Sequence, residues 1–395
     1  MIESMRMSRF LSHKTYATPP FFRDSTRTPC SLSERKILSL LIRRPNLTLA
    51  ELTSLSEFSQ QSISRLIKGM IEKGILVASD RVATGKRGQP SLSTSIVGSY
   101  AYTLGISIMT DCVAIALVNL AGEMVAEATH IPAAMSRKEV LSLIKLSFDR
   151  FTEEHGIQHD NILGAGVAIS GYNLGGRSKF NTPPGLGEWA LIDIDEIIAE
   201  ELNLPVWVEN DGNVAALGES LLGTGRDYEN FAHLFIAAGI GGGIVINGEM
   251  LRGTNGNAGE IGLIVPSNMY PRPMLDLLHT MLQEKGADIQ GISDMLEKFD
   301  PEQPGVNEWI EKTEPALSLV VSAIAAILDT DAIVLGGRIP RSLARMLIEK
   351  LKIYDDGRRS EPRAMPRLTI SDHTGDGGVL GAAMLPLHKY FYSTV

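Results

Sequence analysis

The chain has 395 residues, of which 44% are hydrophobic and 21% are charged, and its formal net charge is −9. This length and apolar content predict two or three domains, each with a hydrophobic core. The sequence has no run of about 18 apolar residues and no apolar secretory leader, so we expect a cytoplasmic protein that does not enter a membrane. Only Cys30 and Cys112 are present, which argues against a disulfide framework.

Charge is unevenly distributed along the chain. Residues 1–90 hold fifteen Lys and Arg against seven Asp and Glu, a net of +8, so the remaining residues carry −17. A basic segment ahead of an acidic body predicts that only the first part meets a polyanion, because the body would be repelled by phosphates. Residues 1–30 mix Arg, Ser, Thr and Pro without a clear period, and we expect a flexible arm there.

Residues 31–95 have the pattern of three short helices followed by two short strands, at 75–79 and 91–94. Three helices with a two-stranded wing make a winged helix-turn-helix, whose third helix enters the major groove of DNA. The expected N-caps are Ser33, Thr48 and Ser59, and the expected stops are Pro45 and Gly74.

The third predicted helix presents a polar face suited to reading bases. Gln and Arg at the start of a helix can pair in a bidentate way with adenine or guanine edges. A compact basic tip in the wing would suit phosphates or a narrow minor groove. The alternative is a protein-docking three-helix module with a solvated charged face. The expected DNA contacts are Gln60, Gln61, Ser62, Arg65, Lys68, Lys86 and Arg87.

Downstream, apolar and alternating runs predict an α/β body. Strands are expected at 102–109, 113–119 and 124–130, a helix at 137–155, and another strand at 163–170. Strands then alternate with helices to the end of the chain.

A glycine-rich region between Trp207 and Gly262 concentrates the polar chemistry of the body. Asn210 and Asp211 follow an apolar strand, a glycine-rich hairpin comes next, and Glu260 lies in a second turn. A small polyhydroxylated ligand needs carboxylates and amides held on turns at strand ends, where glycine lets the backbone approach the ligand. For any single glycine, a hairpin turn with no other role is the alternative.

Seven segments of the body match a known pattern in order and spacing. They are GVAISGY at 166–172, NTPPGLGEW at 181–189, PVWVENDGNVAALGE at 205–219, the GIGGGIVINGEMLRG hairpin at 239–253, AGEIG at 258–262, IVLGG at 333–337 and GAAMLP at 381–386. With them, the chain resembles the ROK family (repressors, open reading frames and kinases) from about Leu32 to the C-terminus. The resemblance implies a two-lobed actin-like (ribonuclease H-like) ATPase fold, with lobes at 98–212 and 213–395, the C-terminal helix lying in the second. It also implies a ligand between the lobes.

The resemblance indicates that nucleotide binding is lost. ROK kinases carry Asp-x-Gly-Gly-Thr in the first hairpin, where close backbone approach holds ATP phosphates. Here Ser107 stands at the Asp, Met109 and Thr110 stand at the glycines, and Asp111 stands at the Thr. Ala238 stands where the kinases usually have Thr in a later loop. The Asp111 carboxylate would repel phosphate, by about 4 kcal/mol for two unit charges about 4 Å apart at an effective dielectric of about 20.

The residues that contact the sugar in ROK kinases are partly retained in this chain. By resemblance, Asn210 and Asp211 fall on the pair that hydrogen-bonds sugar hydroxyls, with Asp211 at the position of the kinases' catalytic base. Glu260 falls on a second sugar-contacting carboxylate, and Asn181 lies in the loop that covers the sugar. Asp276 falls on the last residue of the family's zinc motif. The expected ligand-binding residues are therefore Asn210, Asp211, Glu260, Asn181 and Asp276.

The family's structural zinc site cannot form here in the usual way. Relatives supply a His after Gly262, where this chain has Leu263, and three Cys in a segment that here reads PSNMYPRPMLDLLH. We therefore expect no metal and no cofactor. His279 is interpreted as a surface or packing residue, and Trp189 as a core residue.

These observations favour a transcriptional regulator, a repressor of carbohydrate-related genes, rather than an enzyme. It would bind a palindromic DNA operator as a homodimer or homotetramer, and a sugar or sugar derivative would act as effector. One alternative is a sugar kinase with a DNA-binding head, which would need the missing phosphate-loop residues. The other is a DNA-binding protein that responds to no ligand, which the missing histidine and zinc motif favour.

Overall fold

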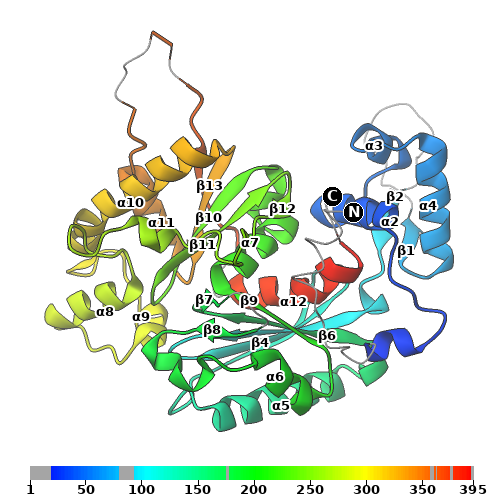
Figure 1. The fold of residues 1–395 in the computed structure, drawn as a ribbon, viewed down its shortest axis with the longest axis horizontal. Coiled ribbons are helices and arrows are strands. Elements are labelled where there is room, and N and C mark those ends of the chain that lie inside the picture. The colour runs from blue at the N-terminus through cyan, green and yellow to red at the C-terminus, as the bar shows by residue number, and fades with distance from the viewer. Residues whose placement is uncertain are drawn as a thin grey trace.

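The structure of the chain is a computed structural model. A small head formed by N-terminal elements lies beside a larger body, and the body has two lobes, each built on a five-stranded sheet (Figure 1). The winged-helix head and the α/β body predicted from the sequence are both present. The described residues are 19–79, 93–174, 178–355, 360–361, 363–373 and 377–392.

The described residues of the head form three helices and two strands. The first helix is capped by Ser31, whose hydroxyl accepts a hydrogen bond from the Glu34 backbone N–H at 3.3 Å in a capping box. The prediction of Ser33 as this cap is wrong, because only Ser31 has an acidic residue three positions later. Thr48 and Ser59 cap the next two helices, as predicted. The elements are α2 (Leu32–Arg43), α3 (Leu49–Ser54), α4 (Gln60–Glu72), β1 (Leu76–Ser79) and β2 (Ser93–Ile96).

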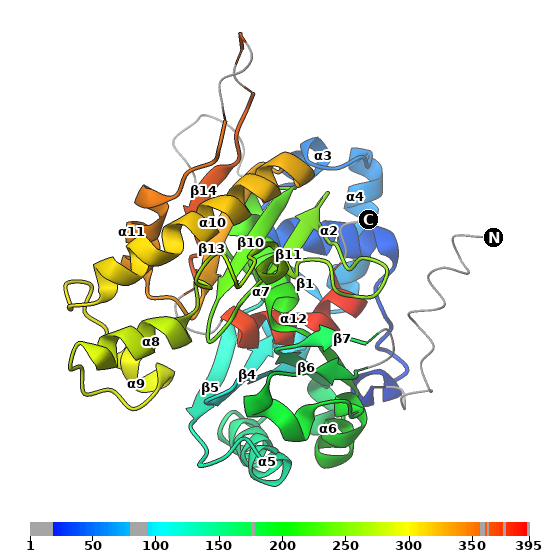
Figure 2. The same ribbon diagram turned by 60° about the vertical axis from the view of Figure 1, so that its left-hand side comes forward.

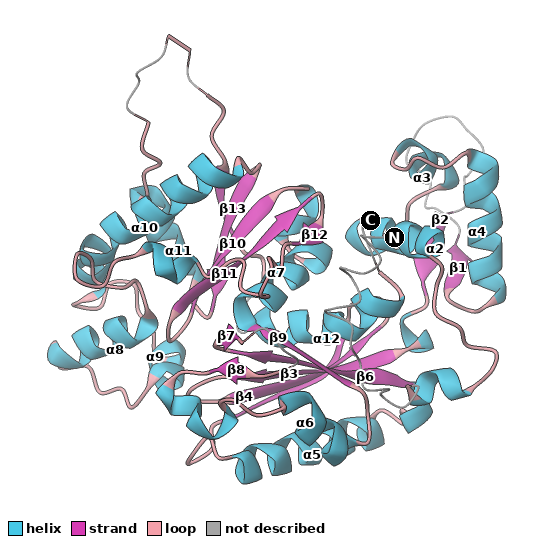
Figure 3. Ribbon diagram, viewed as in Figure 1, coloured by secondary structure: helices cyan, strands magenta, loops and turns pink. Residues whose placement is uncertain are grey.

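The first lobe is a mixed sheet with the order β5-β4-β3-β6-β9 (Figure 3). Strand β4 runs antiparallel to both β3 and β5, whereas β6 pairs in parallel with β3 and β9 pairs in parallel with β6. Helices α5 and α6 cover one face and bury Phe148 and Ile198 against it. The elements are β3 (Tyr102–Ile108), β4 (Val113–Asn119), β5 (Met124–His130), α5 (Arg137–Glu154), β6 (Ile162–Ile169), α6 (Ile194–Leu202) and β9 (Val206–Asn210). A small hairpin, β7 (Tyr172–Asn173) with β8 (Phe180–Asn181), follows β6.

The second lobe has the strand order β12-β11-β10-β13-β14. Helices α10 and α11 cover one face of this sheet (Figure 1). Although α10 has 23 residues, neither it nor another helix among the described residues is long and apolar enough to cross a membrane. The elements are β10 (Phe231–Ile236), β11 (Ile240–Ile246), β12 (Glu249–Met250), α8 (Leu275–Glu284), α9 (Ile292–Glu297), α10 (Val306–Leu328), β13 (Ala332–Gly337), α11 (Arg341–Lys350) and β14 (Arg367–Ile370).

Two helices, α7 (Asp211–Leu222) and α12 (Gly377–Tyr390), lie between the two sheets (Figure 2). They approach closely at Gly381, which has no Cβ. A Cβ at this position would lie 1.9 Å from the Val214 carbonyl oxygen, so only glycine fits. Helix α12 packs on the first sheet, where the Thr103 hydroxyl donates to the Ala383 carbonyl at 2.9 Å. The C-terminal helix, predicted to lie in the second lobe, contacts both lobes, since it also touches β13.

The head shares a hydrophobic core with the body. Leu38 of α2 belongs to the same buried cluster as Leu221 of α7 and Phe391 near the C-terminus. The Arg35 guanidinium donates to the carbonyls of His388 and Tyr392, each at 2.8 Å. Because apolar packing and charged hydrogen bonds both cross this boundary, α2 links the head to α7 and α12.

The segment just before α2 packs on the body. Phe21 is fully buried and meets the rings of Tyr100 and Phe391, with centroids 5.5 and 6.1 Å away. The expectation of a flexible arm is therefore wrong for residues 19–30, because aromatic packing anchors them. Residues 1–18 of the predicted arm lie outside the described residues.

Candidate functional site

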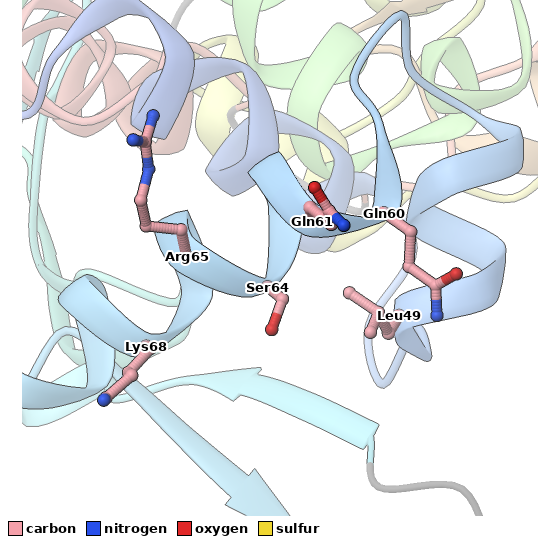
Figure 4. A pocket seen from close by; sticks show the side chains of 6 residues that line it. All are labelled: Leu49, Gln60, Gln61, Ser64, Arg65 and Lys68. Carbon is pink, nitrogen blue, oxygen red and sulfur yellow. The ribbon is translucent and has the colours of Figure 1, made fainter.

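Helix α4 presents a stripe of polar side chains to solvent. Ser59 caps the helix, and Ile63 and Met70 are buried on its inner side, so the 3.6-residue period turns the polar residues outward. Leu66 and Ile67 are only partly buried, and Ile71 is 38% exposed. A shallow pocket on the outer face is lined by Leu49, Gln60, Gln61, Ser64, Arg65 and Lys68 (Figure 4).

Four of the predicted DNA contacts lie together on this stripe: Gln60, Gln61, Arg65 and Lys68. Ser62 does not line the pocket, and its hydroxyl lies 3.0 Å from the Ser59 hydroxyl at the start of the helix. Ser64 takes its place, one turn after Gln60. The signal for Ser64 was in the sequence, since positions i and i+4 share a helix face. Lys86 and Arg87 lie outside the described residues.

A second group of polar residues gathers where β9 ends and α7 begins. Asn210 is the N-cap of α7, and its Oδ1 accepts from the N–H groups of Gly212 at 2.9 Å and Asn213 at 3.3 Å. Its Nδ2 donates to the Gly171 carbonyl at 3.1 Å, across the sheet edge. Asn210 thus holds the backbone around the site. Its position after the strand was equally compatible with contact to a ligand, so the sequence alone did not reveal this role.

Asp211 is the first residue of α7. Its carboxylate accepts hydrogen bonds from the Ser170 hydroxyl and, at 2.8 Å, from the Gly212 N–H. An acidic side chain in the first turn is also favoured by the helix dipole. Ser170, at the end of β6, was not predicted as a site residue; it lies within the matched segment GVAISGY.

Glu260 lies beside Asp211, across the boundary between the lobes. Loss of hydration and the nearby Asp211 charge raise the pKa of Glu260 from 4.5 to about 7. The structure therefore brings Asp211 and Glu260 together, as the sequence predicted, and places like charges side by side. Two carboxylates in this arrangement can accept hydrogen bonds from ligand hydroxyls.

Asn181 lies close to this group through its backbone. It pairs with Tyr172 in the β7–β8 hairpin, and a Cβ on Gly171 would lie 2.6 Å from its carbonyl oxygen. The Asn181 side chain is exposed. The same hairpin is tied to the second lobe, because the Asn257 side chain exchanges hydrogen bonds of 2.7 and 2.8 Å with the Asn173 backbone in β7.

Asp276 belongs to a different group, around the turn between β3 and β4. There, Asp111 Oδ1 lies 2.6 Å from Arg338 Nη1, and Asp111 Oδ2 accepts from the Ser293 hydroxyl at 2.7 Å. Arg338 also donates to the Ser293 hydroxyl at 2.8 Å. The pKa of Asp276 on α8 is raised, first by partial loss of hydration and then by the Asp111 charge. Asp276, near the start of α8, therefore lies within reach of the Asp111 charge.

The Asp111 group connects the two lobes. Asp111 belongs to the first lobe, whereas Arg338 follows β13 and Ser293 lies on α9 in the second. The Arg338 side chain is only 8% exposed. Loss of hydration acts to raise the pKa of Asp111, but hydrogen bonding and the positive charge of Arg338 hold it below its usual value. Asp111 therefore stays ionised and paired.

The sequence also predicted the surroundings of two single side chains, Trp189 and His279. Trp189 is fully buried and donates its indole N–H to the Met135 carbonyl at 3.0 Å, so it is a core residue, as predicted. His279 is partly buried on α8. In the part of the chain that the structure describes, no three His, Cys, Asp or Glu side chains are grouped to hold a metal ion.

Comparisons with known proteins match both parts of the chain. Residues 103–273 match the ROK family model, and residues 31–88 match the MarR family model. An uncharacterized protein of Sinorhizobium fredii is 27% identical over 369 residues, which are 92% of each chain. The xylose repressor of Bacillus spizizenii is 22% identical over 233 residues, 58% of this chain and 59% of the repressor.

Two solved structures share the fold. A ROK family transcriptional regulator, a homologue of the Escherichia coli MLC protein, aligns with a TM-score of 0.63 and 18% identity, over 91% of this chain and 97% of its own. A ROK family glucokinase from Streptomyces griseus, in complex with glucose and AMPPNP, aligns with a TM-score of 0.59 and 19% identity, over 72% of this chain and 99% of its own. These alignments confirm the predicted architecture, a helical head followed by an actin-like ATPase-fold body.

Proposed function

For a chain that carries a ROK-family domain behind a MarR-type winged helix, we propose the function of a DNA-binding transcriptional repressor of carbohydrate-related genes. A sugar or sugar derivative acts as its effector, held at Asp211 and Glu260 between the lobes. The protein binds a palindromic operator as a homodimer or homotetramer and does not transfer phosphate. Xylose repressors and an MLC homologue among its relatives support this proposal.

The polar stripe of α4 is the observation that carries the DNA-binding part. A recognition helix needs side chains that reach base edges from a buried support, and Gln60, Gln61 and Arg65 are such side chains. Lys68 adds positive charge that phosphates attract. The head is basic whereas the body is acidic, which favours contact with DNA through the head alone.

Helix α7 supports the coupling of effector to DNA binding. It begins at Asp211, beside Glu260, and its last turn carries Leu221, which packs in the same core as Leu38 of the head. A ligand that binds one lobe arrangement better than another shifts the population toward it. Because α7 contacts both the ligand group and α2, such a shift changes the spacing of two heads in a dimer.

The Asp111 group supports the absence of phosphotransfer. In ROK kinases, this hairpin turn approaches the ATP phosphates through glycines, whereas here Met109 is buried in the turn and Asp111 is ion-paired to Arg338. A triphosphate would have to displace that pair and then face a carboxylate. A coupled ADP-release assay across hexoses, pentoses and amino sugars tests this, and turnover would favour the kinase alternative, to which the glucokinase likeness of the body points.

DNA binding is tested by selecting duplexes from a random-sequence pool with the full-length protein and measuring their affinity by fluorescence anisotropy. We expect a palindromic consensus with sub-micromolar affinity. Arg65→Ala lowers the slope of log affinity against log salt by about 1 if Arg65 contacts a phosphate, or relaxes one base position if it contacts a base. Arg150→Ala, which removes an exposed arginine on α5 of the first lobe, is the matched control and changes neither.

The effector is tested by thermal shift with a panel of pentoses, hexoses and their acids, followed by anisotropy on the selected duplex. A sugar that raises the melting temperature and weakens DNA binding supports the proposal. A panel without any shift, together with intact DNA binding, favours the alternative of a DNA-binding protein that responds to no ligand.

A further inference from the structure

One apolar side chain lies within the polar surface that faces DNA in the proposed function. Leu49 is the first residue of α3 and is half-buried, with its base against the core of the head. It lines the pocket on the outer face of α4, together with Gln60 and Ser64 (Figure 4). Five of the six residues that line this pocket are polar or charged, so Leu49 is the exception.

The position of Leu49 is held by the fold of the head. Thr48, directly before it, is the N-cap of α3 and forms a capping box with Glu51, with bonds of 2.8 and 3.3 Å. Thr48 also bridges to Ser93 at the start of β2. The backbone at Leu49 is therefore fixed from both the helix and the wing, and its side chain stands beside the first turn of α4.

An apolar spot next to an amide has a specific counterpart on DNA. In the major groove, the thymine 5-methyl group is the apolar feature of the base edges, and adenine offers the donor and acceptor pair that Gln recognises. Gln60 and Leu49 point toward the same space (Figure 4), so together they present an amide and an apolar surface to one part of the groove. Arg65 and Lys68 on the same pocket favour a polyanion over a neutral partner.

We propose that Leu49 is a specificity-determining residue that packs against a thymine 5-methyl group, and that the operator carries an A·T pair at the position read by Leu49 and Gln60. This inference rests on the proposed function, because it assumes that α4 enters the major groove. It adds a selection for thymine that operates through burial of a methyl group rather than through a hydrogen bond.

The experiment uses the duplex selected from the random pool and replaces each thymine in turn by deoxyuridine, which lacks only the 5-methyl group. We expect one position per half-site where the wild-type protein binds about fourfold more weakly, the size of burying one methyl-sized group. Leu49→Ala binds thymine and deoxyuridine duplexes equally well at that position. Leu55→Ala, which truncates a 40% exposed leucine of the same head outside the pocket, retains the fourfold difference.

The Leu49–thymine contact and the DNA-binding function are contradicted by different results. If every deoxyuridine duplex binds the wild-type protein as well as the thymine duplex does, Leu49 does not read a methyl group, although DNA recognition stands. A deoxyuridine penalty that persists in Leu49→Ala also overturns the assignment, because another residue then makes the contact. If no duplex is enriched from the pool, the proposed DNA-binding function itself fails. Because the thymine and deoxyuridine affinities are compared within one protein, a partial folding defect in Leu49→Ala lowers both affinities and cancels in their ratio.

Discussion

Asp111 and Asp211 both lie at the boundary between the lobes, but their surroundings are opposite. Asp111 has a cationic partner within the chain, since Arg338 lies 2.6 Å away and Ser293 completes the contact. Asp211 has the Ser170 hydroxyl, one backbone N–H and a second carboxylate, Glu260, as neighbours. One carboxylate is neutralised by the second lobe, whereas the other is crowded by like charge.

The Asp111 group is a completed ion-pair contact, whereas the Asp211 group can accept a ligand. An ion pair with a buried arginine satisfies its own groups and leaves little for another molecule to gain. Two neighbouring carboxylates repel each other, and hydroxyl donors from a ligand would offset that repulsion. The comparison supports a protein that holds its lobes together at the Asp111 group and keeps ligand recognition at the Asp211 group.

The largest expected effect comes from breaking the Asp111 group. Arg338→Met leaves the half-buried Asp111 carboxylate without its cation, and we expect a loss of about 3 kcal/mol in the free energy of unfolding. Urea denaturation measures this loss. Arg341→Met, which removes a more exposed arginine 3.7 Å from Asp372, is the control and should cost less than about 1 kcal/mol. Equal losses in both variants would show that the Asp111 group does not hold the lobes.

The next effect is on effector affinity. Asp211→Asn keeps the shape of the side chain but removes the charge that strengthens hydrogen bonds to ligand hydroxyls, and we expect affinity to fall about tenfold. Isothermal titration with the sugar that gives the largest thermal shift measures this change. Unchanged affinity in Asp211→Asn would place the effector elsewhere.

A smaller effect is the pH dependence of stability through Glu260. Its folded pKa of about 7 lies above the ordinary value of 4.5, so the folded state keeps a proton that the unfolded chain releases. The wild-type protein therefore loses stability as pH rises from about 4.5 to about 7, by roughly 1 kcal/mol after allowance for solvent screening. Glu260→Gln should remove this loss, so it is more stable than wild type at pH 8 and no more stable at pH 4. Parallel pH profiles for the two proteins would contradict the raised pKa of Glu260.

The smallest effect tests where Asp276 belongs. Because its pKa responds to Asp111 rather than to Asp211, we expect Asp276→Asn to change effector affinity less than twofold. The same titration as for Asp211→Asn gives the answer. A tenfold loss would return Asp276 to the ligand group, where the sequence had placed it.

The sequence alone determined the elements whose pattern is local. Strands at 102–108, 113–119 and 124–130 match the predicted runs closely, because buried strands read as apolar segments between turns. The outer face of α4 followed from the 3.6-residue period, and the pairing of Asp211 with Glu260 followed from the family resemblance. The N-cap of α2 could also have been predicted correctly, because Ser31 and Glu34 have capping-box spacing.

Tertiary structure decided the contacts between distant segments. Arg338 lies 227 residues from Asp111, and no local period or spacing connects them. The same holds for the packing of α12 on the first sheet, for Phe21 on the body, and for Asp276 beside Asp111. A local pattern depends on neighbours along the chain, whereas these contacts depend on which surfaces meet after both sheets have formed.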